Sequence, residues 1–491
     1  MIFSFIAFLL FLTLAVILFF DLRYSLFSLL KNVKIKEYPS LDKKINVAVI
    51  IPVKNEKFEV LKKRINNIME IKNIEFKDVN FYFIIVDDTD FKKSESRKIL
   101  DKIPAKIYYY KNFLVYDFGN FHYLFRLKGI KMKGPAVNDA VLYAKERFNI
   151  KYFALYDVEW TITLEYIVKA VRILENRKDL SFVFWNRRTI PWDGFHKILG
   201  IYVDHFFETT LYGKTYLDGI SMAHGSCGVF RLKDFLEFGG FKPHITEDAE
   251  LTVRMYLNGK RGLYIRDWIE YGQNLPGNIN VSLKTYLRWA YGTIDVVLTY
   301  FKEILFSKKL NLMQKLSLIH MFTHFYSFAI AFFLILINYI ILAFRIVTPD
   351  YFYFEQFFLW ITPIIVLLLI LVYLPTYYRI YGKINITDLL KVVILGWGLS
   401  VIHIYALLKR IFIGKEEWVV TKKIREKERV RQEIFTIYSI MFFLILPLFI
   451  IYLISNVKYP GKLILGGLSY FIWVVSLLWI LVKQIEHEAR I

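Results

Sequence analysis

The chain has 491 residues, of which 56% are hydrophobic and 18% are aromatic, and its one cysteine is Cys227. This composition excludes an intrinsically disordered chain, which is poor in apolar and aromatic residues, and it excludes a disulfide-stabilised scaffold. The formal charge of +21 has two ordinary explanations, binding of nucleic acid or contact with an anionic membrane surface, and the position of the apolar residues decides between them.

Long uncharged runs contain most of the apolar excess. The first twenty residues carry no charge and have the length that a helix needs to cross a bilayer. Basic residues follow this run and no small-residue cleavage site ends it, which predicts an N-terminal anchor over 1–30 rather than a cleaved signal peptide. Similar runs predict a pair of spans in 319–374, at 319–344 and 357–374. A second pair is predicted in 434–491, at 434–454 and 463–482, with a short cytoplasmic tail. We therefore expect a multi-pass protein of the plasma membrane, with the chain after residue 31 in the cytoplasm, and no nucleic-acid partner.

The segment 385–433 has a mixed pattern. Its apolar part, 389–408, contains Lys391, His403 and a Gly-Trp-Gly sequence, and polar groups are costly at the centre of a bilayer. The part that follows is rich in Lys and Arg and belongs in the cytoplasm by the positive-inside rule. We interpret 385–433 as an interfacial or re-entrant helix followed by a cytoplasmic loop. The alternative is a sixth span with an external basic loop.

The interval 35–280 alternates strand-like and helix-like runs. Ile45–Val53 is an apolar, β-branched run typical of a buried parallel strand, and the loop after it contains Glu56. A second such run ends in Asp87 and Asp88. In open α/β sheets the ligand crevice lies beyond the carboxyl ends of the strands, where carboxylates can hold a ribose, a base edge or a metal. The alternative is that these carboxylates only cap the next helix.

A third strand-like run, at 151–156, ends in Asp157-Val158-Glu159. Carboxylates at positions i and i+2 of an extended segment point the same way, and they are hard ligands for Mg²⁺ or Mn²⁺, which neutralise a diphosphate. Upstream, Lys133 and Gly134 open a helical stretch and can face a phosphate. A solvated acidic pair and an ordinary surface loop are the alternative interpretations.

Two further motifs lie between 220 and 260. The small residues Gly225, Ser226 and Cys227 indicate a tight turn or a close approach of the backbone. Glu247 and Asp248 open a helix, where acidic residues are favourable for the helix dipole alone. The functional interpretation is a carboxylate that faces the cleft as a general base.

The interval 281–318 is predicted to form interfacial helices just before the next spans. It contains Arg288 and Trp289 within an aromatic, basic stretch. Trp289 is either an interfacial anchor or a floor on which a sugar stacks.

These pieces occur in a characteristic order, and together they resemble the membrane-bound family 2 glycosyltransferases, which include cellulose, hyaluronan and chitin synthases. The matching pieces are VIIPVKNE, VDDTD, YDVE where the family has D-x-D, TED, and LRW where the family has Q-x-x-R-W. In addition, Trp418-Val-Val-Thr-Lys-Lys is similar to the F-x-V-T-x-K gating loop of cellulose synthases. The resemblance implies an α/β, Rossmann-like cytoplasmic domain of the GT-A type combined with an α-helical transmembrane bundle.

The resemblance also implies an inverting transfer from a nucleotide-sugar donor, a UDP-sugar by preference, to a lipid or glycan acceptor with Mg²⁺ or Mn²⁺ as cofactor. Asp248, next to Glu247, would be the general base, and Asp157 and Glu159 would hold the metal. The acceptor would lie against Trp289 and the turn Gly225, Ser226 and Cys227. The residues implied to contact the nucleotide are Glu56, Asp87, Asp88, Lys133, Arg288, Trp418, Thr421 and Lys423.

Two positions depart from the family pattern. Glu159 replaces the second Asp of D-x-D, and Thr285 stands where the family has Gln in a motif that accompanies chain elongation. The alternative within enzymes is therefore a lipid-sugar synthase that adds a single sugar, resembling dolichyl-phosphate mannose synthase or ceramide glucosyltransferase. The alternative outside enzymes is a transporter or channel.

Overall fold

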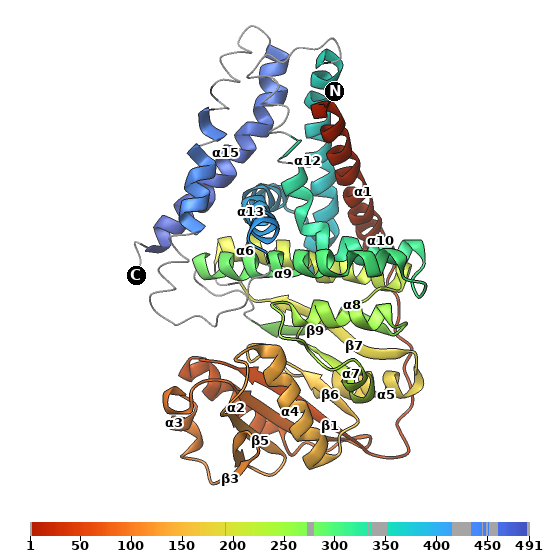
Figure 1. The fold of residues 1–491 in the computed structure, drawn as a ribbon, viewed down its shortest axis with the longest axis vertical. Helices are drawn as coiled ribbons and strands as arrows, with labels where there is room; N and C mark the ends of the chain where they lie inside the picture. The colour runs from red at the N-terminus through yellow and green to blue at the C-terminus, as the bar shows by residue number, and fades with distance from the viewer. Residues whose placement is uncertain are drawn as a thin grey trace.

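The computed structural model describes residues 2–191, 193–272, 279–331, 333–334, 351–414, 434–443, 445–447, 450 and 460–488. Its lower half in Figure 1 is an α/β domain and its upper half is built from long helices. The predicted combination of an α/β domain with an apolar helical part is confirmed.

A mixed nine-stranded sheet forms the centre of the lower half. Its strands are β1 (Ile45–Val53), β2 (Val79–Asp87), β3 (Lys106–Tyr110), β4 (Phe113–Asp117), β5 (Phe121–Arg126), β6 (Tyr152–Leu155), β7 (Leu180–Thr189), β8 (Gly228–Arg231) and β9 (Arg261–Gly272). Their spatial order is β3-β4-β5-β2-β1-β6-β8-β7-β9. Since β1 runs parallel to both β2 and β6, the carboxyl ends of these three strands meet at one edge of the sheet.

Both faces of the central strands are covered, which is why their sequences are apolar without a break. On β1, Ala48 and Ile50 belong to one core cluster, while Val47, Val49 and Ile51 belong to the other. The first cluster includes apolar residues of helix α4, and the second includes those of helices α2 and α5. The helices of this half are α2 (Phe58–Ile71), α3 (Arg97–Leu100), α4 (Lys133–Phe148), α5 (Leu164–Asn176), α7 (Leu232–Glu237) and α8 (Glu247–Leu257), with a short helical turn η1 (Phe91–Lys93).

The remaining helices cross the middle of the molecule or rise from it (Figure 1). Their bounds are α1 (Ile2–Leu30), α6 (Gly194–His205), the π-helical turns η2 (Phe206–Leu211) and η3 (Lys214–Asp218), α9 (Ile279–Phe306), α10 (Leu312–Thr323), η4 (His324–Tyr326), α12 (Tyr351–Tyr381), α13 (Ile386–Phe412) and α15 (Pro460–Glu488). Helices α9 and α10 run across the middle, whereas α1, α12 and α15 extend upward along the long axis.

Among the described residues, three helices are long and apolar enough to cross a membrane: Leu9–Leu30, Ile364–Tyr381 and Ile386–Phe412. The first two fall on predicted spans. The predicted spans at 319–344 and 434–454 lie partly outside the described residues. The predicted span at 463–482 falls within α15.

Helix α13 contains the segment predicted to be interfacial. It is nearly end on in Figure 1, whereas α1, α12 and α15 are seen along their length, so α13 runs across their direction. It packs against α6, α9, α12 and α15. Its length and composition also suit a span. The interfacial interpretation of 389–408 therefore stays a prediction.

Buried polar contacts join α1 to the lower half. Tyr24 donates a hydrogen bond to Asp218 with an O–O distance of 2.6 Å, and Arg23 lies 2.7 Å from the other oxygen of the same carboxylate. Further along α1, Arg266 of β9 donates to the hydroxyl of Ser28 at 2.8 Å. The first helix is therefore bound directly to the sheet domain.

Candidate active site

A cavity of about 640 Å³ lies at the edge where the carboxyl ends of β1, β2 and β6 meet. Pro52 and Val53 line it from the end of β1, Asp88 from the residue after β2, and Asp157 and Glu159 from the loop after β6. The starts of α4 and α8 and one side of α9 close it. This is the crevice that the strand topology predicts for a ligand.

Most of the residues that the sequence singled out line this one cavity. They are Glu56, Asp88, Lys133, Asp157, Glu159, Gly225, Glu247, Asp248, Arg288 and Trp289. Asp87, Ser226 and Cys227 are not among its lining residues. Trp418, Thr421 and Lys423 lie outside the described residues, so their roles stay predictions.

Lys133 is at the centre of the polar part of the cavity. Its Nζ lies 2.5 Å from Asp157 Oδ1 and donates a hydrogen bond to the carbonyl of Gly225 at 2.8 Å. Burial lowers the pKa of Lys133, but the nearby carboxylates, Asp157 first among them, outweigh burial and leave the pKa raised. The side chain is therefore a stable cation among the carboxylates.

Gly134 permits this placement of Lys133. A Cβ at Gly134 would lie 2.9 Å from the Cβ of Phe241 and 3.3 Å from the Cβ of Glu247. The first turn of α4 therefore packs directly against the Gly-Gly-Phe turn and the start of α8. A larger residue would push the helix, and with it Lys133, out of position.

Asp157 and Glu159 are the candidate metal ligands. The backbone N–H of Asp157 donates to the hydroxyl of Ser226 at 2.8 Å, so Ser226 supports this loop rather than facing the cavity. Burial, with the nearby Asp157 carboxylate, raises the pKa of Glu159 to about 8. Within the described residues, no cluster of three or more His, Cys, Asp or Glu side chains could hold a metal alone. The two carboxylates supply hard oxygen ligands. They fit a divalent cation whose other ligands come from a diphosphate and water.

Asp248 lies in the first turn of α8, opposite the small-residue turn. Its Oδ1 accepts a hydrogen bond from the N–H of Ala249 at 2.8 Å. Gly225 has φ +73°, and a Cβ there would lie 2.7 Å from Asp248 Oδ2. Burial raises the pKa of Asp248, while Lys133, the Ala249 N–H and Arg187 act in the opposite direction. The geometry leaves Oδ2 as the oxygen that faces the glycine turn.

Glu247 precedes the candidate base and is more deeply buried. Burial raises the pKa of Glu247 to about 7, although the charge of Lys133 opposes the rise. Two carboxylates and one lysine are thus coupled within the same cavity. The protonation of one changes the charge that the others experience.

The neighbouring carboxylates Asp87 and Asp88 have different surroundings. Asp87 accepts hydrogen bonds of 2.8 Å each from the N–H of Thr89 and the hydroxyls of Ser94 and Tyr123. Asp88 faces the cavity and lies 3.0 Å from Arg126 and 3.2 Å from Lys131. Asp87 therefore organises the loop after β2, while Asp88 presents its charge to the cavity.

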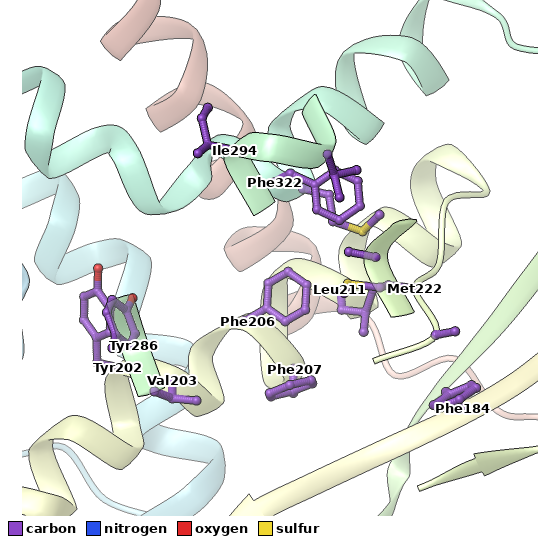
Figure 2. Packing of buried hydrophobic residues seen from close by; sticks show 14 of the residues in the cluster. Phe184, Tyr202, Val203, Phe206, Phe207, Leu211, Met222, Tyr286, Ile294 and Phe322 are labelled. Carbon is purple, nitrogen blue, oxygen red and sulfur yellow. The ribbon is translucent and has the colours of Figure 1, made fainter. Parts of the chain in front are cut away.

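The opposite end of the cavity is apolar. Six side chains there form what we call the apolar wing: Val203, Phe206, Phe207, Met222, Met321 and Phe322. Figure 2 shows Phe206, Met222 and Phe322 converging from different elements of the chain. The wing is formed by α6, η2, α10 and the loop after η3, in the half of the molecule that contains the candidate spans. Tyr286, Arg288 and Trp289 of α9 also line the cavity.

Sequence reasoning missed four residues that shape the site: Arg64, Arg187, His224 and His244. Arg64 of α2 donates to the carbonyl of Val158 at 3.0 and 2.8 Å and thus holds the loop between Asp157 and Glu159. The other three line the cavity. His224 and His244 stand next to motifs that the sequence identified, and this adjacency was the available signal. Arg64 and Arg187 lie in ordinary helix and strand patterns that gave none.

Comparisons with known proteins agree with this architecture. The description "Glycosyl transferase family 2" matches residues 48–239, and "Glycosyl transferase family group 2" matches residues 187–376. A probable glucomannan 4-beta-mannosyltransferase 7 from Oryza sativa subsp. japonica is 23% identical over 35% of this chain and 30% of that protein. A probable glucomannan 4-beta-mannosyltransferase 14 from Arabidopsis thaliana is 21% identical over 59% of this chain and 53% of that protein. The chain thus spans about a third to a half of the length of these relatives.

Among solved structures, a mannosyltransferase from Pyrobaculum calidifontis, in complex with GDP-Man and Mn²⁺, has a TM-score of 0.55 at 14% identity. The match covers 84% of this chain and 100% of that one. At this identity the comparison shows the fold, which is of the GT-A type. Because the two family matches together span residues 48–376, the predicted family is confirmed. The chain belongs to the family 2 glycosyltransferases.

Proposed function

We propose that the protein is an inverting, metal-dependent glycosyltransferase that moves a sugar from a nucleotide donor to an acceptor at a membrane. One observation carries this proposal. The carboxylate pairs Asp157/Glu159 and Glu247/Asp248 face a single cavity, with Lys133 between them at 2.5 Å from Asp157. An inverting transfer needs a cation site for the departing diphosphate and a base on the opposite side of the sugar.

The donor is proposed to lie at the strand-end side of the cavity. Asp157 and Glu159 would hold Mg²⁺ or Mn²⁺, which would neutralise charge on the leaving diphosphate. Lys133 would add a second cation, and Asp88 would face the nucleoside. The relatives are named mannosyltransferases and the Pyrobaculum enzyme was solved with GDP-Man, which makes GDP-mannose the first donor to test. The UDP-sugars that the sequence favoured are the second group.

Asp248 is proposed to take the proton from the acceptor hydroxyl. Its Oδ1 is engaged by the Ala249 N–H, so Oδ2 receives the proton. The acceptor oxygen then forms the new bond to the anomeric carbon while the bond to the diphosphate breaks, and the configuration inverts because the two groups lie on opposite faces. Asp248 must be ionised at the start, and the cations of Lys133 and Arg187 favour that state.

The experiment uses Asp248→Asn, which removes the proposed base and leaves the shape of the side chain almost unchanged. Nucleotide release is measured with purified, full-length protein, Mn²⁺ and a panel of GDP-mannose, UDP-glucose and UDP-N-acetylglucosamine. Turnover with the preferred donor should fall by about 10²–10⁴-fold, the usual contribution of a general base, while binding of the nucleotide stays. The control is Glu250→Gln in the same helical turn, because Glu250 pairs with Arg254 and does not line the cavity. Retained turnover in Asp248→Asn would contradict the assignment of the base.

Metal dependence has its own test. EDTA should abolish turnover, and Mn²⁺ or Mg²⁺ should restore it in the wild type but not in Glu159→Gln. Full activity in EDTA would contradict the metal requirement. The control substitution is Glu165→Gln, because Glu165 is exposed on α5. Its turnover should be restored by metal, as in the wild type.

The acceptor is proposed to be a glycan or a lipid at the plasma membrane, with the α/β domain in the cytoplasm. The helices suited to crossing a membrane support this, and so does the apolar wing beside the site. The wing also favours the second candidate, transfer of one sugar to a lipid. Product size separates the two: a high-mass polysaccharide would contradict single addition, and a single glycolipid would contradict polymer synthesis.

A further inference from the structure

Arg187 is a buried cation near the end of β7. It is 9% exposed and lines the cavity. Its guanidinium lies 4.6 Å from the ring centroid of Phe207 and 5.5 Å from that of Trp160. Within the described residues no hydrogen bond or ion pair reaches it, and its Nε is buried without an acceptor. The guanidinium of the next residue, Arg188, forms an ion pair with the carboxylate of Glu208 at 2.6 Å.

His224 lies in the same part of the cavity. It is 3% exposed, and in the part of the chain that the structure describes no well-aligned hydrogen bond reaches either ring nitrogen, although the backbone of Trp185 is close enough to act on the pKa of the ring. Its ring contacts the aromatic rings of Phe184 and Phe207, with centroids at 4.9 and 5.0 Å. Burial lowers the pKa of His224 well below its ordinary value, and the charge of Arg187 adds to this effect. The neutral ring therefore offers an acceptor nitrogen to a ligand.

The position of this pair assigns it to the acceptor side. Phe207, which Arg187 contacts, belongs to the apolar wing, and His224 immediately precedes the glycine that faces Asp248. Figure 2 shows Phe207 next to Phe206 at the base of the wing. The cations at the strand-end side of the cavity already have carboxylate partners: Lys133 has Asp157, and Lys131 has Asp88. Arg187 has no such partner among the residues that the structure describes.

A buried guanidinium without a carboxylate in direct contact is costly, and contacts with two aromatic rings offset only part of that cost. An anion placed against it would form short, charge-assisted hydrogen bonds, and carboxylate and phosphate match its fork of donors. A neutral imidazole beside the anion can bond a hydroxyl of the same ligand. Aromatic and aliphatic side chains next to both would take an apolar group.

We propose that Arg187 and His224 form an acceptor subsite for an anionic head group, with the apolar wing holding the hydrophobic part of the same molecule. The acceptor is then an acidic amphiphile that carries either a carboxylate, as in an acidic sugar, or a phosphate ester. This proposal names the acceptor class of the proposed glycosyltransferase and rests on that function.

The experiment measures binding of three octyl probes to the full-length protein in nanodiscs: octyl glucuronide, octyl phosphate and octyl glucoside. The chain is the same in each, so differences report the head group. We expect at least one acidic probe to bind about tenfold or more tightly than octyl glucoside, as a charge-assisted hydrogen bond supports. The preferred acidic probe identifies the source of the anion.

Variants connect the preference to the pair. Arg187→Gln should remove the discrimination between acidic and neutral probes, Arg187→Lys should keep part of it, and His224→Phe should weaken the glucuronide more than the phosphate. Lys131→Met is the control, because it removes a cation from the opposite end of the cavity and should leave the discrimination unchanged. Binding of GDP and UDP to Arg187→Gln should match the wild type, which shows that the domain is folded.

Equal binding of all three probes to the wild type would overturn the proposal, whatever the variants do. Discrimination that persists in Arg187→Gln would also overturn it. If Arg187 only kept Asp248 ionised, Arg187→Gln would shift the pH profile of turnover and leave probe discrimination intact, so that outcome counts against the subsite. Failure of the wild type to bind any nucleotide would refute the proposed function instead. The binding of the octyl probes is measured separately, so the two failures can be told apart.

Discussion

Gly225 and Asp248 lie in direct contact although 23 positions separate them in the chain. The glycine has φ +73°, and a methyl group on it would lie 2.7 Å from Asp248 Oδ2. Residues that carry a side chain rarely adopt this backbone conformation. The short distance to Asp248 also leaves no room for a Cβ. The small-residue turn therefore forms one wall around the oxygen proposed to take the proton.

The first prediction concerns this wall. Gly225→Ala should lower turnover by about 10²-fold or more, because a small displacement of a catalytic group is this costly, while nucleotide binding is retained. The control is Gly239→Ala, since Gly239 has the same φ of +73° and nothing lies within 4 Å of its Cβ position. Both variants carry the same backbone strain. Equal losses of turnover in the two would show that strain alone, and not contact with Asp248, is responsible.

The second prediction concerns pH. Burial raises the pKa of Asp248 and the charge of Lys133 lowers it, so removal of Lys133 raises it further. Because the base acts when ionised, turnover declines as the pH falls through this pKa. Lys133→Met should therefore move the acidic limb of the kcat profile to higher pH, in addition to weakening the donor site. Profiles between about pH 5 and pH 9 measure the shift.

Lys131→Met is the matched control for that shift. Lys131 lines the same cavity but lies 3.2 Å from Asp88, and it is not among the main causes that shift the pKa of Asp248. The acidic limb of the kcat profile of Lys131→Met should coincide with that of the wild type. A common shift in both variants would point to a general change of charge in the cavity rather than to Lys133.

The third prediction separates Asp87 from Asp88. Asp87→Ala leaves three buried donors without their acceptor and should lower the free energy of unfolding by about 1–3 kcal/mol or more. Asp88→Asn keeps the shape and a hydrogen-bond acceptor for Arg126, and should mainly weaken nucleotide binding. Thermal unfolding and nucleotide titration of both variants decide the matter. If the two swapped these effects, the assignment of Asp88 to the donor would fail.

The fourth prediction concerns a chain of contacts from α13 to the turn before α8, the helix that begins with the proposed base. Asp295 of α9 lies 2.5 Å from Arg410 and 2.7 Å from His244 Nε2. His244 Nδ1 in turn accepts the N–H of Thr246 at 3.1 Å, one residue before Glu247. Asp295→Asn should loosen this turn and lower kcat several-fold with little effect on nucleotide affinity.

The control for Asp295 is Asp388→Asn at the other end of α13. Asp388 pairs with Lys197 of α6 at 2.6 Å and is not among the residues that line the cavity. If Asp295 acts through the turn before α8, Asp388→Asn should leave kcat unchanged. A similar decrease in both variants would mean that any weakening of the α13 contacts is sufficient.

The sequence alone determined the fold class and the main polar motifs. Strands follow from local patterns: β1 begins and ends at the residues of the apolar run that predicted it, Ile45–Val53. The carboxylates after β6 and at the start of α8 were recognisable because each sits at the end of an element, where a ligand crevice forms. Chain order then identified the family, which the comparisons confirm.

Only the tertiary structure decided how these motifs are used. Asp87 and Asp88 are adjacent in sequence, but side chains alternate direction along a strand, so one is buried in the loop and the other faces the cavity. The pairing of Lys133 with Asp157 and the contact of Gly225 with Asp248 join residues more than twenty positions apart. Arg187 has no local pattern that marks it, because the lack of an ion pair among the described residues is a property of three-dimensional packing. Most polar residues that line the cavity were therefore recognisable from local sequence, whereas the pairing of Arg187 with His224 required the fold.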